Sequence, residues 1–139
     1  SKVPVSAPEQ TLPETADALP PQLADQINGL ENRARQADAK FTANLPAAQA
    51  AVQAATSAAI GSEAWIKAHM LLSRLDAGRG EGVSALAELD TILAQEGARE
   101  QGRAATLLTP LIMAVHARVA ERIEFQNQTI DRLSRQVGQ

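Results

Sequence analysis

The chain has 139 residues, a formal net charge of -3 at pH 7 and a charged fraction of 21%. Its length suits one domain, and it lacks the clustered Lys and Arg that nucleic-acid binding requires. Apolar residues make up 45%, aromatic residues only 2%, and cysteine is absent, which excludes disulfides, cysteine-ligated metals and thiol chemistry and predicts an aliphatic core.

Residues 1–20 are predicted to be a Pro-rich tail or tether. Four of the seven prolines fall within this segment, and proline removes backbone donors and favours extended conformations in the residue before it. The chain begins at Ser1 rather than at a methionine, so we expect an upstream segment to precede it. Such a tether is typical of a domain held at a distance from an anchor.

Residues 21–139 are predicted to form a single all-α domain, an antiparallel helical bundle of about five helices. The first helix is expected over 21–44, because apolar residues recur there at steps of three and four. This face comprises Leu23, Ile27, Leu30, Ala34, Ala37, Phe41 and Leu45. Pro46 predicts the end of that helix, since the residue before a proline avoids the helical conformation.

An alanine-rich second helix is expected over 46–60, followed by Gly61 as a C-cap and Ser62 as the cap of the next helix. The third helix, over 62–77, is the most apolar, and Trp65 is expected in the core. Three glycines then follow in the segment Gly78–Gly82, which predicts a turn because glycine is costly inside a helix.

A fourth helix is expected over 83–96, so that the third and fourth helices would form an antiparallel hairpin. Helical periodicity continues over 98–137, with a break or kink near Pro110. At the end of this last helix, apolar residues recur at seven-residue intervals and indicate a short heptad seam. This seam either packs back on the first helix or joins two copies in a homodimer.

Catalytic and cofactor chemistry find little support in the sequence. The two histidines, His69 and His116, lie near Met70 and Met113, and imidazole with thioether is a ligand set for haem or copper. However, His69 and Met70 are adjacent and point about 100° apart on a helix, so no four-ligand cluster follows. No nucleophile motif or phosphate-binding loop is present either. We therefore expect no enzyme, no metal and no cofactor.

Two functions remain open. The first is a non-enzymatic helical interaction or scaffolding domain, with Arg118, Arg122 and Arg132 as a partner surface because arginine is favoured at interfaces. Its protein partner is not identified by the sequence, and the tether favours the soluble part of a bacterial envelope protein, periplasmic or in the cell envelope rather than cytoplasmic. No transmembrane segment is expected in this chain, since its longest uncharged stretch is mostly alanine.

The alternative function is a small ligand-binding helical bundle. In that reading, an apolar cavity lies near Trp65, His69 and His116, where the alanine-rich second helix would leave room for a ligand.

Overall fold

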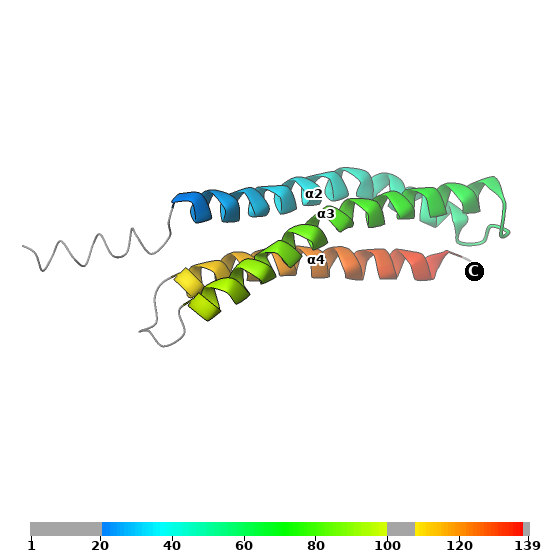
Figure 1. Ribbon diagram of the computed structural model, residues 1–139. Coiled ribbons are helices and arrows are strands. Elements are labelled where there is room, and N and C mark those ends of the chain that lie inside the picture. The colour runs from blue at the N-terminus through cyan, green and yellow to red at the C-terminus, as the bar shows by residue number, and fades with distance from the viewer. Residues whose placement is uncertain (1–20, 100–107, 138–139) are drawn as a thin grey trace, which may run out of the picture.

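The computed structural model describes residues 21–99 and 108–137, and these residues form three long helices. Helix α2 comprises Pro21–Ala55, α3 comprises Glu63–Arg99 and α4 comprises Leu108–Gln136. Figure 1 shows an elongated bundle in which α3 runs antiparallel to both neighbours, so that α2 and α4 run in the same direction. The predicted all-α class is confirmed, whereas the count of five helices is wrong.

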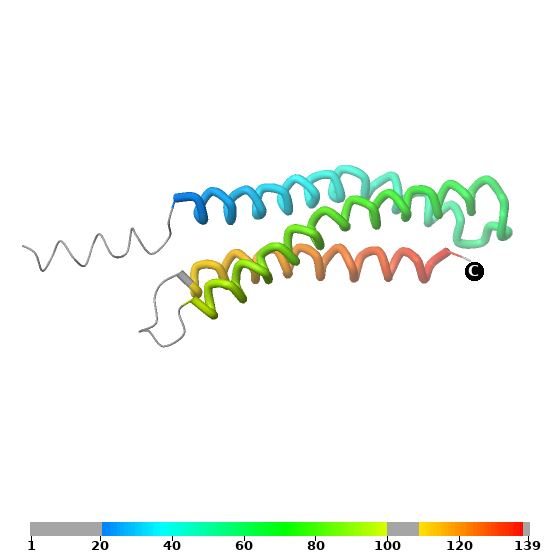
Figure 2. The backbone as a smooth tube through the Cα atoms, viewed as in Figure 1, coloured from blue at the N-terminus to red at the C-terminus, as the bar shows by residue number. Residues whose placement is uncertain are grey.

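The helix boundary expected at Pro46 is the first correction. Pro46 lies inside α2, so the helices expected over 21–44 and 46–60 are one helix that ends at Ala55. Proline cannot donate to the carbonyl four residues earlier, and Figure 2 shows α2 bending in its cyan part near this position. Val52 and Ala55 beyond the proline are fully buried, so packing compensates for the missing hydrogen bond.

The turn expected at Gly78–Gly82 is the second correction. Helix α3 passes through these glycines without interruption, so the hairpin of helices over 62–77 and 83–96 does not form. A Cβ atom added to Gly82 would lie 3.4 Å from Cγ1 of Ile123. Gly82 therefore faces α4 at the point where Ile123 packs, and a Cβ there would be in van der Waals contact with that side chain.

The ends of the helices follow the sequence more closely. Gly61 has a φ of 88° in the turn between α2 and α3, and Oγ of Ser62 accepts a hydrogen bond from the backbone N–H of Trp65 at 3.3 Å. The predicted Ser62 cap is thus confirmed. Pro110 lies in the first turn of α4, where proline is tolerated, so the helix expected over 98–137 starts at Leu108 instead. Residues 100–107 lie outside the described part, as does the predicted tail over 1–20.

The core consists of two apolar clusters, one at each end of the bundle. The first apolar cluster contains Ile27, Leu30, Ala34, Ala85, Leu89, Ile92, Ile112, Val115, Val119 and Ile123. The second apolar cluster contains Phe41, Ala48, Ala51, Val52, Ala55, Ala68, Leu72, Leu75, Leu133 and Val137. On α4 the stretch between them carries Gln126 and Thr129, each only 1% exposed, so polar side chains divide the core in two.

The C-terminal heptad seam is used inside the bundle. Leu133 and Val137 belong to the second apolar cluster, and Ile130 packs partly against it. They therefore pack against the end of α2 and the start of α3, whereas Leu23 and Ile27 at the start of α2 pack in the first apolar cluster. Phe125 remains exposed on the surface of α4.

Candidate functional site

Long polar side chains bridge α2 and α4. Arg118 donates from Nε and Nη2 to the two carboxylate oxygens of Glu31, at 2.7 and 3.1 Å. Arg122 donates from Nη1 to Oδ2 of Asp38 at 2.7 Å, and Gln126 donates from Nε2 to Oδ1 of the same residue at 3.0 Å. The three α4 residues are spaced four apart, which places them on one side of the helix. We call this row of five residues the α2–α4 seam.

Glu31 is the most enclosed charged group of the seam, with 8% of its side chain exposed. The hydrogen bond from Arg118 lowers the pKa of Glu31, and the positive charges of Arg118, Arg35 and Arg122 act in the same direction against the opposing effect of burial. The same hydrogen bond raises the pKa of Arg118. The pair therefore holds two opposite charges at neutral pH and joins α2 to α4 through two residues that are 87 positions apart in the sequence.

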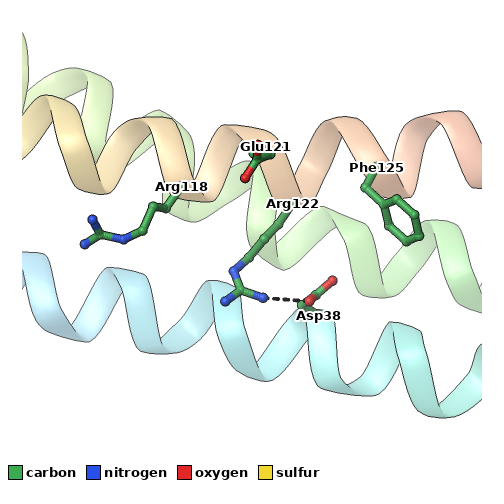
Figure 3. A pocket seen from close by; sticks show the side chains of 5 residues that line it. All are labelled: Asp38, Arg118, Glu121, Arg122 and Phe125. Atoms are coloured by element: carbon green, nitrogen blue, oxygen red, sulfur yellow. Dashed lines mark hydrogen bonds and ion pairs between the residues drawn. The ribbon is translucent and has the colours of Figure 1, made fainter.

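A hollow of about 380 Å³ opens along the seam, lined by Asp38, Arg118, Glu121, Arg122 and Phe125. Figure 3 shows Arg122 reaching across to Asp38 and Phe125 pointing from α4 towards α2. The Phe125 residue is 56% exposed, although large apolar side chains nearby on α4 are buried. The hollow thus combines fixed charges with one open aromatic ring.

The arginines predicted as a partner surface lie on this side of α4. Arg118 and Arg122 both line the hollow, and Arg132 is exposed seven residues after Phe125, which places it on the same face of the helix. Sequence reasoning missed the carboxylates of α2 that hold the first two arginines, because nothing in the sequence gives the register between α2 and α4. The seven-residue spacing from Arg118 through Phe125 to Arg132 was the available signal for the shared face.

The residues predicted to surround an apolar cavity do not come together. Trp65 and His69 are one turn apart on α3 with ring centroids 4.2 Å apart. Trp65 is only partly buried at the edge of the second apolar cluster, so its expected place in the core is corrected. His116 instead lies 2.6 Å from Asp90, which follows His69 by 21 residues on α3 and is therefore about 30 Å from it along the helix. The three residues line no common site.

A second hollow, of about 530 Å³, lies at the start of α3 and is lined by Glu63, Ala64, Ile66, Lys67 and Met70. Ile66 and Met70 are exposed there. This hollow has no ion pairs crossing between helices in the described structure, in contrast to the seam. It provides an apolar surface of comparable exposure at a different place on the bundle.

Within residues 21–99 and 108–137, no group of three or more His, Cys, Asp or Glu side chains is arranged to hold a metal ion. None of the described helices combines the length and hydropathy needed to cross a membrane. The chain matches no protein-family model, and comparisons with curated proteins and with solved structures give no match either.

Proposed function

We propose that this chain is a non-enzymatic helical interaction domain and that a helix of a partner protein docks in the hollow of the α2–α4 seam. The observation that carries the proposal is the 56% exposure of Phe125 beside the two arginines that line the hollow with it. Burying such a side chain contributes about 1.5 to 3 kcal/mol, and the bundle itself leaves this contribution unused.

The charged side chains around Phe125 support the same proposal. Arg118 and Arg122 are already held by carboxylates of α2, so a partner does not have to order them on binding. Association costs less when the contacting side chains are fixed beforehand. Aromatic and arginine side chains are also the residues that most often anchor protein interfaces.

A small-ligand function receives less support. It requires Trp65, His69 and His116 to share a cavity, and His116 lies at the other end of the bundle beside Asp90. This separation argues against a single apolar cavity formed by the three residues.

Site-specific photo-crosslinking in native cells tests the docking surface. A photoreactive phenylalanine analogue placed at position 125 is expected to give one dominant adduct whose crosslinked peptide comes from a helix of another protein. The same analogue at Ile66, an exposed apolar position in the second hollow, is the matched control and should not give this adduct. Absence of any adduct from position 125, or the same adduct from both positions, would contradict the proposal.

A further inference from the structure

We infer that the helix that occupies the α2–α4 seam is an acidic amphipathic helix. This inference rests on the proposed docking function and names the chemical class of the partner. Its basis is that the carboxylates of the seam are more buried than the guanidinium groups that pair with them.

The carboxylates of the seam lie inside and the guanidinium groups lie outside. The side chains of Glu31 and Asp38 are 8% and 23% exposed, whereas those of their partners Arg118 and Arg122 are 54% and 37% exposed. In these two ion pairs, an approaching helix therefore meets the guanidinium groups before the carboxylates. The pairing with Glu31 uses Nε and Nη2 of Arg118, so Nη1 has no partner among the described residues and is free to donate to a carboxylate.

Four residues of α4, spaced seven apart, form a row on the face of the helix beside the seam. Leu111, Arg118, Phe125 and Arg132 all fall at the same heptad position, so apolar and basic side chains alternate along it. Leu111 and Phe125 are exposed large apolar residues of this row. A helix that follows the row makes the best contacts when its own apolar and acidic residues alternate at the same interval.

The charge of this row stands out against the rest of the chain. The whole protein carries a net charge of -3, yet the row contains two arginines and no acidic residue. Glu121 is the exposed carboxylate that lines the hollow, and its charge opposes the inferred partner. Removal of the Glu121 charge should therefore strengthen binding of an acidic helix, whereas removal of an arginine charge should weaken it.

Three synthetic helical peptides test the inference on the full chain by fluorescence anisotropy. In each peptide, one row of residues spaced seven apart alternates between an apolar residue and a variable residue. The variable residue is Glu in the first peptide, Gln in the second and Lys in the third. The Glu peptide should bind about tenfold more tightly than the Gln peptide, with the Lys peptide weakest, and its affinity should fall with added salt.

Variants of the full chain locate the binding. Phe125→Ser should abolish binding of the Glu peptide, Arg132→Gln should weaken it several-fold and Glu121→Gln should strengthen it. Ile66→Ser, in the second hollow, is the control and should leave the affinity unchanged.

Each other outcome overturns a defined part. If the three peptides bind equally and Phe125→Ser abolishes all binding, the acidic partner is wrong while the docking surface stands. If the Glu peptide binds Phe125→Ser as tightly as the parent, or if no peptide binds, the inference is overturned, and the crosslink at position 125 then decides the proposed function separately. If sedimentation shows that the parent chain is a dimer and that Phe125→Ser is a monomer, the seam binds a second copy of this chain instead of an acidic partner helix.

Discussion

Among residues 21–99 and 108–137, two buried polar atoms in the middle of the bundle have no hydrogen-bond partner, namely Oε1 of Gln126 and Oγ1 of Thr129. An unsatisfied buried polar group costs about 1 to 3 kcal/mol. Around them, Arg79 donates to Oδ1 of Asn127 at 2.8 Å, and Gln126 donates to Asp38. These contacts make a polar layer between the two apolar clusters, and polar groups at such positions can fix the register of packed helices at the expense of stability.

Replacement of Thr129 by valine should stabilise the protein by about 1 kcal/mol, because the change keeps the shape of the side chain and removes the unsatisfied hydroxyl. Urea denaturation measures the change. Thr91→Val, at an exposed site of α3, should shift stability by less than about 0.5 kcal/mol. A loss of stability at position 129 would mean that the hydroxyl has a partner, such as a bound water.

Acid should weaken the seam through Glu31. Because the Arg118 hydrogen bond lowers the pKa of Glu31 from its usual value of 4.5, ionised Glu31 stabilises the fold above that usual value. This contribution is lost as the pH falls through the lowered pKa of the folded state. The free energy of unfolding, measured by urea denaturation from pH 7 to pH 3, should depend less on pH in Glu31→Gln than in the parent. Glu81→Gln changes an exposed carboxyl of α3 and serves as the control; identical pH dependence of Glu31→Gln and the parent would refute the role of Glu31.

At the scale of helices, the sequence predicted buried faces better than boundaries. All seven residues of the face from Leu23 to Leu45 are buried or partly buried, as expected from their spacing. The wrong boundaries are those at Pro46 and at Gly78–Gly82, where the local sequence predicts helix stops but α2 and α3 continue. Each glycine costs a helix about 1 kcal/mol relative to alanine, and burial of several aliphatic side chains on both sides of the glycines exceeds that cost. A proline or glycine in the sequence predicts a helix end, but the sequence around it does not reveal the contacts with other helices that keep the helix intact.

Substitutions at two of these glycines should have opposite effects. Gly80→Ala should stabilise α3 by up to about 1 kcal/mol, because a Cβ at position 80 meets no atom within 4 Å. Gly82→Leu should destabilise the protein, because even a Cβ there would touch Ile123. Thermal unfolding compares the two variants with the parent. A lower melting temperature for Gly80→Ala would indicate that the helix needs the freedom of glycine at that position.

For the whole molecule, the parallel course of α2 and α4 creates the candidate site. The sequence could identify Arg118 and Arg122 as surface residues, but their partners Glu31 and Asp38 depend on a register set by the intervening helix. If the chain formed a hairpin at Gly78–Gly82, α4 would start at a different place along α2, and Arg118 and Arg122 would not lie opposite Glu31 and Asp38. The tether over 1–20 and the envelope location stay predictions of the N-terminal composition.

The continuity of α3 is the claim on which the seam depends, and a distance measurement tests it most directly. The chain contains no cysteine, so cysteines introduced for spin labels at the exposed positions Glu63 and Gln95 would be the only ones in the protein. These positions are 32 residues apart, and an unbroken helix separates them by about 48 Å. Pulsed electron resonance should show a single distance near this value. A hairpin at Gly78–Gly82 would place the two ends side by side, and a distance below about 20 Å would contradict the structure described for α3.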